Sequence, residues 1–514
     1  MPAPSYPIDK EPCIPVLFLD GRHQYLGLRE LLLHAHDIED LALPLPPAAS
    51  GLLRVLTAIV ARITELDDPE MSAGAWAACR RALLEQPHGF DADAIHAYFD
   101  RYTWDLFDPV RPFLQDPRLR TQCTARAGVN KLVFGRPEGN NLAWLSPHTD
   151  TSPHPVPTEQ ALWHLLIHHY YGGAGTCSVR TVAGRSLSKA KSGPLRSSVS
   201  FHPLGRTLYE TLLAHLPKPA DHWPEAADRC PWEEPELPDP LAPPSPVTWP
   251  GQLLTGRSNH ALLLIPSADG RQVTDAYVTT ARDTKLPALD PYLIHEATAR
   301  GTGERIPREA DADKALWRDL DALCLAGDED AAVQRPDAFT TLNDLPAGLR
   351  AQLRVRVHGF DQEGWTRNRT WYTALTPPIW PWTQEHDPGM AERIAECRTA
   401  AEAVGALLEE VSKDAWRTIT TPSGGSRPAR APKRLPLWTK HTSTSYWPRA
   451  ERVFWHLLDH PEPDARTAFA TEAVAVLREV TRPVVARHFP AARAVAQAVS
   501  TLLGAPRPRR RSAR

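Results

Sequence analysis

The stretch AASGLLRVLTAIVARITEL, residues 48–66, carries the clearest secondary-structure signal in this 514-residue chain. Its aliphatic side chains recur at the spacing of one face of an α-helix. A helix with such a face must pack against other elements to remove that face from water. The stretch therefore predicts a core helix over about residues 47–66, with an apolar face of Leu52, Leu53, Leu56, Ile59, Val60, Ile63 and Leu66.

The pattern of elements around this helix changes once along the chain. Before about residue 383, helical segments alternate with hairpins, two of which are marked by the turn dipeptides Asp20-Gly21 and Asp269-Gly270. After that point only helical patterns remain, and their number fits a four-helix bundle. We expect an α+β fold with a mixed α/β domain over residues 1–383, a four-helix bundle over 384–504 and a disordered basic tail over 505–514.

Composition limits the classes of protein to which the chain belongs. A chain of this length is too long for one ordinary core. The formal net charge is −3, so a surface for nucleic acid must be local rather than general. The seven cysteines are scattered and form no C-x-x-C pair, which argues against disulfides and a cysteine zinc site. We see no leader and no apolar run of membrane-spanning length, and we expect a cytoplasmic protein without membrane contact.

No enzyme motif is recognisable in the chain. A P-loop, a G-x-S-x-G elbow, a kinase signature and a dinucleotide fingerprint are all absent from the sequence. We therefore expect no catalytic residues and no cofactor. His164 and His168 are four residues apart on a predicted helix and would suit a shared metal ion. No glutamate follows the first histidine, however, and packed or surface histidines are the more common arrangement.

The segment YYGGAGT, residues 170–176, ends a predicted helix in a cluster of glycines. One interpretation is a helix C-cap, in which a single glycine takes the left-handed conformation. The other is a backbone that must lie close to another molecule, which three glycines in four positions would favour. The residues in question are Gly172, Gly173, Ala174 and Gly175.

Two basic segments are candidates for contact with phosphates. The first, RTVAGRSLSKAKSGPLR at residues 180–196, has no acidic residue; it is either a solvated loop or a phosphate-binding surface. The second, RVRVHGFDQEGWTRNRTW at residues 354–371, predicts a hairpin with a turn over 359–364. It is either an ordinary sheet hairpin or a two-stranded ribbon that enters a DNA groove. The candidate phosphate contacts are Arg180, Arg185, Lys189, Lys191, Arg354, Arg356, Arg367 and Arg369.

Several longer motifs occur in the order in which one known family has them, over nearly the whole chain. They include CIPVLFLDGRHQYLGLRELL near the start, WDLFDPVRPFLQDPRL at residues 104–119 and PEGNNLAWLSPHTD at 137–150. ALWRDLDAL at 315–323 and YWPRAERVFWHLLD at 446–459 follow. The chain resembles the large subunit of the type I-E CRISPR Cascade complex. It departs from the family's opening P-W-I-P-V by carrying Cys13 in place of tryptophan.

The resemblance implies a non-catalytic protein of antiviral defence with an N-terminal α/β domain and a C-terminal four-helix bundle. Its partners would be the other Cascade subunits (backbone, small and guide-processing subunits), the CRISPR guide RNA, target double-stranded DNA and a helicase-nuclease. Such a subunit recognises the protospacer-adjacent motif beside the target, promotes strand separation and R-loop formation, and recruits the helicase-nuclease. Protein reads the motif in such systems, while base pairing reads the target.

The resemblance also assigns roles to particular residues. The glycine loop that reads the motif would be residues 172–175. The family's lysine finger falls in HEATARGTGER, which has no lysine, so Arg300 is the first candidate and Arg305 the second. A glutamine wedge would be Gln362 at the tip of the hairpin, flanked by Asp361, Glu363 and Gly364. The guide's 5′ end would lie near a mobile loop formed by Ala127, Gly128, Val129, Asn130 and Lys131.

Two alternatives to the motif-reading subunit remain open at this stage. One is a free-standing metal-dependent hydrolase that uses His164 and His168 with a carboxylate. The other is a purely structural scaffold subunit, which would join the complex without any preference for a motif.

Overall fold

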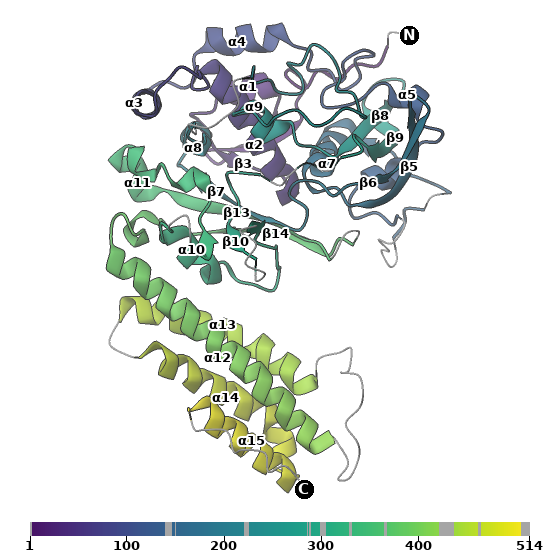
Figure 1. The fold of residues 1–514 in the computed structure, drawn as a ribbon. Helices are drawn as coiled ribbons and strands as arrows, with labels where there is room; N and C mark the ends of the chain where they lie inside the picture. The colour runs from purple at the N-terminus through teal and green to yellow at the C-terminus, as the bar shows by residue number, and fades with distance from the viewer. Residues whose placement is uncertain are drawn as a thin grey trace. The chain divides into compact units, whose positions relative to one another are not determined.

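The computed structural model describes residues 3–138, 146–149, 151–219, 226–284, 286, 289–298, 305–327, 331–363, 367–420, 436–460 and 464–504. The chain forms two compact units (Figure 1). Unit 1 comprises Met1–Leu316 and Ala326–Pro381, and unit 2 comprises Trp317–Leu325 and Trp382–Arg514. Helices and several small sheets occur together, which confirms the expected α+β class.

Within the described part of unit 1, the strands form five small sheets, all with antiparallel pairing. The hairpins β1–β2 and β8–β9 are joined at the two predicted Asp-Gly turns, which confirms both. The sheet orders are β2-β1-β3, β11-β10-β12, β14-β13-β7, β4-β9-β8 and β5-β6. The strands are β1 Ile14–Phe18, β2 His23–Leu26, β3 Ile38–Leu41, β4 Val156–Pro157, β5 Gly175–Val182, β6 Arg185–Ala190, β7 Val199–Leu204, β8 His260–Pro266, β9 Gln272–Thr280, β10 His295–Ala297, β11 Arg305–Pro307, β12 Val333–Gln334, β13 Arg354–Asp361 and β14 Thr370–Leu375.

One helix, α2 (Pro46–Ile63), forms the centre of unit 1 and matches the predicted core helix within a turn. It packs against α7, α8, α9 and β13. The other α-helices of unit 1 are α1 Leu28–Leu33, α3 Ala73–Leu84, α4 Ala92–Arg101, α5 Leu119–Gln122, α6 Val129–Leu132, α7 Thr158–Tyr171, α8 Leu208–His215, α9 Gly251–Thr255 and α11 Ala347–Gln352.

The prediction that α2 has a single apolar face is wrong, because nearly every side of the helix is buried. By length and composition α2 would also pass for a membrane-spanning helix, contrary to the expectation from sequence. However, 89% of that stretch is buried inside the protein, which is typical of the core helix of a soluble fold. Its polar side chains must therefore find partners within the interior.

Arg54 of α2 finds such a partner in Asp290, and both side chains are buried. The guanidinium Nε lies 2.6 Å from Asp290 Oδ2, and Nη2 lies 2.8 Å from Oδ1. Nη1 donates to the Ser50 carbonyl oxygen, one turn earlier, over 2.8 Å. Asp290 Oδ1 also accepts the backbone N–H of Tyr292 over 3.0 Å. This two-pronged ion pair joins the core helix to the segment that contains Asp290 and Tyr292.

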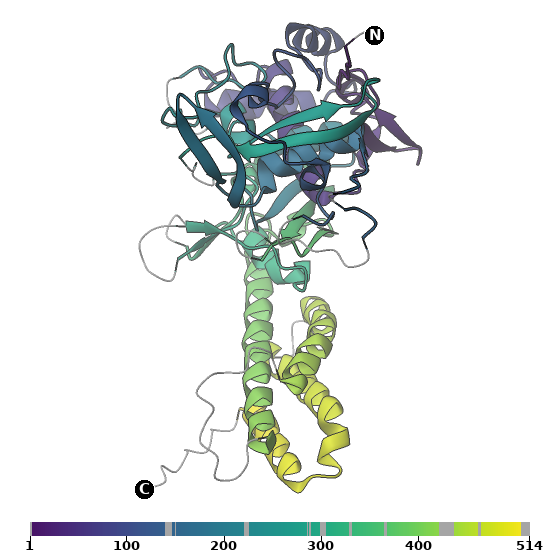
Figure 2. The same ribbon diagram turned by 90° about the vertical axis from the view of Figure 1, so that its right-hand side faces the viewer.

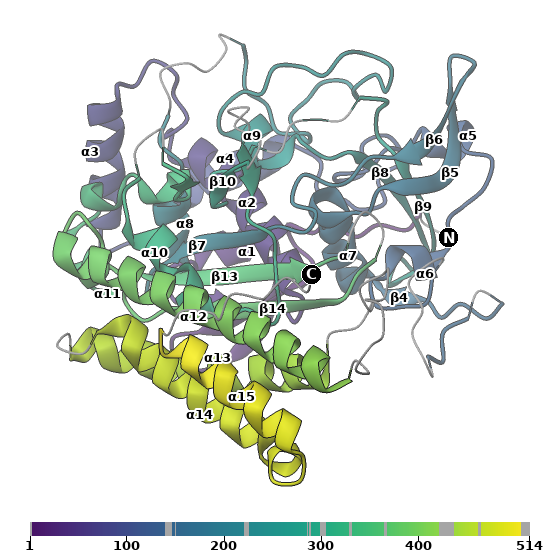
Figure 3. The same ribbon diagram turned by 60° about the horizontal axis from the view of Figure 1, so that its bottom comes forward.

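Unit 2 contains four long helices that run alongside one another (Figures 2 and 3). They are α12 Pro388–Thr420, α13 Leu437–Asp459, α14 Ala465–Val485 and α15 Phe489–Leu502. The domain boundary expected after residue 383 lies close to the observed one after Pro381. The basic tail expected over 505–514 lies outside the described residues.

The short segment Trp317–Leu325 belongs to unit 2, although the sequence assigned it to the N-terminal domain. It carries η1 (Leu316–Asp319) and α10 (Leu320–Cys324). The centroid of the Trp317 ring lies 4.7 Å from that of Phe454, with the rings tilted by 34°, and Arg318 forms a two-pronged ion pair with Glu402. The segment therefore packs with unit 2, through the buried tryptophan and these charge-assisted bonds, although the residues on either side of it in the chain belong to unit 1.

We expect that Asp290→Ala lowers the free energy of unfolding by about 3–5 kcal/mol, because it leaves the charge of Arg54 buried without a partner. The double variant Arg54→Met with Asp290→Leu should cost much less than the single variant, since no unpaired charge remains. Urea unfolding followed by circular dichroism measures both. Equal losses for the single and double variants would contradict this account of the core.

Candidate nucleic-acid interface

The glycine segment begins where α7 ends, and Gly172 is there because no side chain fits. A Cβ at this position would lie 2.5 Å from His260 Cε1 and 2.6 Å from the His168 carbonyl oxygen. Gly172 has φ −55° and ψ 143°, so it is an extended residue rather than a left-handed cap. The interpretation of this residue as a left-handed C-cap is therefore wrong, and close packing is the reason for the glycine.

His260, the first residue of β8, holds the next residue of the glycine segment. Its Nε2 lies 3.0 Å from the carbonyl oxygen of Gly173. Burial lowers the pKa of His260 to about 4, so the ring is neutral at pH 7. Since a carbonyl can only accept, the neutral ring must carry its proton on Nε2. This bond fixes the direction of the backbone at Gly173.

The last glycine of the segment starts the hairpin formed by β5 and β6. Gly175 has φ +134°, a conformation that side chains disfavour, and it lies opposite Ala190 in the pairing register. The next pair in the register is Thr176 with Lys189, whose side chain is exposed. The hairpin therefore places a cation directly beside the glycine segment.

A groove of about 480 Å³ opens along the glycine segment, and we call it the interface groove. It combines three predicted elements that are far apart in the sequence: the glycine segment, the predicted guide-end segment and the far end of the 354–371 hairpin. The residues that line it include Asn130, Lys131, Arg136, Glu138, Gly173, Ala174, Gly175, Arg196, His260 and Asn368. Cations outnumber carboxylates in this set, which suits a polyanion.

The predicted guide-end segment, residues 127–131, is anchored rather than loose. The backbone N–H groups of Ala127 and Gly128 both approach the carbonyl oxygen of Ala276 on β9, at 2.8 and 3.3 Å. Residues 129–132 form α6, and its Val129 and Asn130 are buried. Part of the expected loop is thus a short helix, and its mobility stays a prediction. Lys131 is partly exposed, pairs with Glu138 at 2.7 Å and faces the groove.

Gln362 is buried, so the expectation that it forms an exposed tip is wrong for this structure. Its side-chain oxygen accepts the N–H of Ser197 over 3.1 Å. Its Nε2 donates to the carbonyl oxygen of Tyr171 over 3.2 Å and to Asn368 Oδ1 over 2.8 Å. Gln362 therefore connects the end of the hairpin to the residue that precedes Gly172.

Arg196 reinforces the same connection from the other side. It donates to Asn368 Oδ1 over 3.0 Å and to the carbonyl oxygen of Arg367 over 2.8 Å. Burial lowers the pKa of Arg196 to about 10, so it remains a cation at pH 7. Glu363, the neighbour of Gln362, is exposed and lies 3.7 Å from Arg367. Gly364 lies outside the described residues.

The hairpin over 354–371 is a hairpin as predicted, but it is not a free ribbon. β13 pairs on one side with β14 and on the other with β7, which makes it the central strand of a sheet. β13 extends through Asp361, so the turn begins later than the expected 359. The alternative of an ordinary sheet hairpin is therefore correct. β13 is part of a three-stranded sheet, and its apolar side chains are buried.

The predicted phosphate contacts fall into two groups. Arg180 is fully buried and pairs with Asp116 at 2.5 Å, so the structure contradicts a surface role for it. Arg356 pairs with Asp40, and Arg369 with Asp361 at 3.1 Å, so both already have acidic partners. Arg185 is exposed and pairs with Asp283. The remaining candidates among the described residues are exposed or half-buried: Arg185, Lys189, Lys191, Arg354 and Arg367.

The predicted finger segment forms the hairpin β10–β11. Arg300, the first candidate, is outside the described residues. Arg305, the second, begins β11 and donates to the carbonyl oxygen of Ala331 over 2.9 Å.

His164 and His168 do not form a metal site in this arrangement. His168 Nε2 lies 3.0 Å from the Leu132 carbonyl oxygen, and His164 Nδ1 accepts the N–H of Phe134 over 3.3 Å. Burial lowers the pKa of His164 to about 3. Among the described residues, no group of three or more histidines, cysteines and carboxylates is placed to hold a metal ion. The two imidazoles instead hold α6 against α7.

Comparison with known proteins identifies the family. Residues 9–487 match the family model described as CRISPR-associated protein Cse1, so the chain belongs to the Cse1 family. A curated relative, the CRISPR-associated protein CasA/Cse1 of Thermus thermophilus, is 26% identical over 467 residues, which cover 88% of this chain and 85% of that protein. The family expected from the sequence motifs is thereby confirmed.

Solved structures agree with this assignment. A chain in a structure of a CRISPR RNA-guided surveillance complex is 38% identical, with a TM-score of 0.86 over 98% of this chain and 100% of that chain. A second structure, described as the same kind of complex before nicking, is also 38% identical and has a TM-score of 0.77. Thermus thermophilus CasA (Cse1) has a TM-score of 0.71 at 20% identity, which shows a shared fold.

We expect Gly172→Ala to destabilise unit 1 by about 1–3 kcal/mol, because the added methyl group overlaps His260 and a backbone carbonyl. Gly74→Ala is the matched control, since a Cβ at this position in α3 meets nothing within 4 Å. In a helix that change should be neutral or slightly stabilising. Thermal unfolding measures both, and equal behaviour of the two variants would contradict the packing account.

We expect Gln362→Ala to cost about 1–3 kcal/mol of stability, because it leaves buried donors and acceptors around it without partners. Glu363→Ala removes the exposed neighbour and should change stability by less than about 0.5 kcal/mol. Urea unfolding of both variants provides the comparison. A freely exposed Gln362 would make the two changes equally mild, which would overturn the placement described here.

Proposed function

We propose that this chain is the large subunit of a type I-E CRISPR Cascade complex, where it reads the protospacer-adjacent motif on duplex DNA. The observation that carries the proposal is the interface groove, which brings the glycine segment, the guide-end segment and the end of the 354–371 hairpin together. Membership of the Cse1 family and the relatives in RNA-guided surveillance complexes support the same role.

In this proposal the glycine segment contacts the minor groove beside the target. A backbone without side chains at 172, 173 and 175 can approach base edges closely. Lys189 on β6, Lys191 just after it and Arg185 at its start bind the flanking phosphates. Contacts of this kind position a protein on a duplex without reading its sequence.

Strand separation in this proposal begins at the end of the 354–371 hairpin, between Glu363 and Arg367. Gln362 would act as a wedge only after it leaves its bonds to Ser197, Tyr171 and Asn368. In the unbound chain it is a positioning residue that sets the distance between the hairpin end and the glycine segment. The finger role of Arg300 or Arg305 at the β10–β11 hairpin stays a proposal of the same kind.

The proposed protein acts by binding and needs no catalytic residue or cofactor of its own. The guide RNA would meet the chain at residues 127–131, of which Lys131 faces the interface groove. After the duplex opens, the complex would recruit the helicase-nuclease that degrades the target. A hydrolase built on His164 and His168 is not favoured, because both imidazoles already bond to the α6 region.

The decisive experiment reconstitutes the guide-RNA complex with and without this chain. We would measure its affinity for duplexes that differ only in the three bases flanking the target. The proposal predicts a dependence on those bases only when the chain is present, and its loss in Gly173→Asp, which places a carboxylate against DNA. A complex that includes the chain but shows no base preference would instead support a scaffold, and failure to join would overturn the proposal.

The double variant Lys189→Ala with Lys191→Ala separates phosphate contact from motif reading. It should weaken binding to all flanking sequences alike and reduce the slope of log affinity against log salt by about 2, since two phosphate contacts are lost. Lys10→Ala removes an exposed lysine elsewhere and should leave that slope unchanged. A changed order of preference among the flanking sequences would contradict a pure phosphate role for the two lysines.

A further inference from the structure

A second cavity in unit 1 is larger than the interface groove and is not used by the proposed function. It measures about 580 Å³ and lies between the 101–118 and 231–238 segments and the residues that follow α9 and β9. It shares His260 with the interface groove. We call it the arginine cavity, because Arg111, Arg118, Arg180, Arg257 and Arg282 all line it.

Arg257 is the unusual member of this set. It is 4% exposed, yet within the described part of the chain none of its Nε, Nη1 and Nη2 atoms has a hydrogen-bond partner. An arginine presents five donors in a rigid fork, and leaving all of them unpaired in the interior is costly. Natural proteins keep such groups where a ligand or ion satisfies them.

Arg282, which follows β9, lies close enough to increase the demand for an anion. Its buried Nε also has no partner among the described residues. Burial is the largest cause that lowers the pKa of Arg257 to about 10; the charge of Asp290 raises this pKa, and the charge of Arg282 lowers it further. Arginine stays protonated in proteins, so the two guanidinium groups carry like charges that repel each other.

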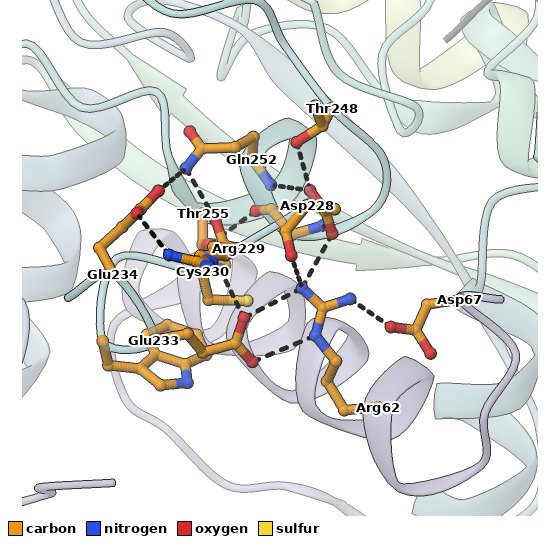
Figure 4. A network of polar contacts seen from close by, with 12 residues as sticks. Arg62, Asp67, Asp228, Arg229, Cys230, Glu233, Glu234, Thr248, Gln252 and Thr255 are labelled. Carbon is orange, nitrogen blue, oxygen red and sulfur yellow. Dashed lines mark hydrogen bonds and ion pairs between the residues drawn. The ribbon is translucent and has the colours of Figure 1, made fainter. Parts of the chain in front are cut away.

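The carboxylates around the cavity do not neutralise these two arginines. Glu233 is held by Arg62 at 3.0 Å (Figure 4). It also accepts the Tyr98 hydroxyl over 2.6 Å. Glu234 lies 3.3 Å from Gln252 Nε2 and 3.9 Å from Arg229.

The two remaining acids of the cavity are also engaged or remote from its interior. Asp116 is taken by Arg118 and Arg180. Glu236 is exposed at the cavity's edge. Within the described residues, no ion pair joins any of the four acids to Arg257 or Arg282. Asp290, whose charge raises the pKa of Arg257, is already paired with Arg54.

We propose that the arginine cavity binds a phosphorylated small molecule of about nucleotide size, with its phosphate held by Arg257 and Arg282. A phosphate monoester carries a charge of about −1.5 to −2 at pH 7, which matches two guanidinium groups. Its three terminal oxygens accept the paired N–H groups that a guanidinium presents. The ligand would supply the partners that the protein itself does not provide.

The size and walls of the cavity indicate an organic group beyond the phosphate. A volume of about 580 Å³ lies within the roughly 300–1,000 Å³ that is usual for small-molecule sites. Phe113, Trp232 and Leu286 contribute apolar surface to its lining. An apolar wall with a few convergent polar groups is the usual composition of such a site.

The test uses the full chain and titration calorimetry with AMP, with ribose 5-phosphate and with inorganic phosphate as probes. We expect AMP or ribose 5-phosphate to bind, and Arg257→Met to weaken that binding at least about tenfold. Arg206→Met is the matched control, because it removes an exposed arginine paired with Glu210 and should leave binding unchanged. Thermal unfolding without phosphate gives a second readout, the melting temperature of the unliganded Arg257→Met variant. A structural role for Arg257 predicts that this temperature falls, whereas a ligand-binding role predicts that it does not.

Each outcome decides the proposal. If Arg257 serves a ligand, Arg257→Met should leave the unliganded melting temperature unchanged or raise it, since a buried unpaired charge is removed. A clear loss of melting temperature with unchanged probe binding would overturn the proposal and assign Arg257 a structural role. If none of the three probes binds, the proposal is also overturned. If inorganic phosphate binds as tightly as AMP, the inference that the ligand carries an organic group is overturned.

Discussion

The buried pair of Arg54 and Asp290 is the interaction on which the rest of unit 1 depends. The guanidinium is a fully buried charge on a core helix whose residues are nearly all buried. Ser50, one turn away, accepts from Arg54 Nη1 and hydrogen-bonds with the hydroxyl of Tyr171 and with Ser200 Oγ, each over 3.0 Å. The polar side of α2 thus holds the end of α7 and the strand β7 together.

These two attachments determine the geometry of the interface groove. Tyr171 precedes the glycine segment, and β7 pairs with β13, which leads to Gln362. Gln362 then donates to the carbonyl oxygen of Tyr171, so the two routes from α2 meet again beside Gly172. A closed circuit of hydrogen bonds of this kind fixes distances that single contacts would leave variable. The groove is therefore a property of the core and not of its surface loops.

The features that could be predicted from sequence are those set by local pattern. The core helix, two Asp-Gly hairpins and the four-helix C-terminal unit follow from periodicity and turn chemistry. Burial of Arg54, Arg180 and Gln362 could not be predicted, because each depends on a partner more than 60 positions away in the chain. Arg180 in a basic run looks like a surface cation until Asp116 is placed beside it. The glycine cluster was the most informative local signal of close packing. At Gly172 any side chain would overlap His260, so only glycine fits there.

The partners of Gln362 were missed for the same reason. Ser197 and Asn368 are ordinary polar residues in loop-like sequence, and nothing local marks them as neighbours of one another. The same holds for His260, whose bond to Gly173 spans 87 positions. Family motifs supplied the role of the glycine segment, but only the fold shows what holds it in place.

The central claim is that duplex DNA lies along the glycine segment and β6, and hydrogen–deuterium exchange in the assembled guide-RNA complex tests it most directly. Addition of a target duplex with its motif should slow exchange of the backbone amides of residues 173–177 and 185–191. A duplex without the motif should protect the first set much less than the second. Unchanged exchange at both sets on binding the motif-bearing duplex would contradict the account.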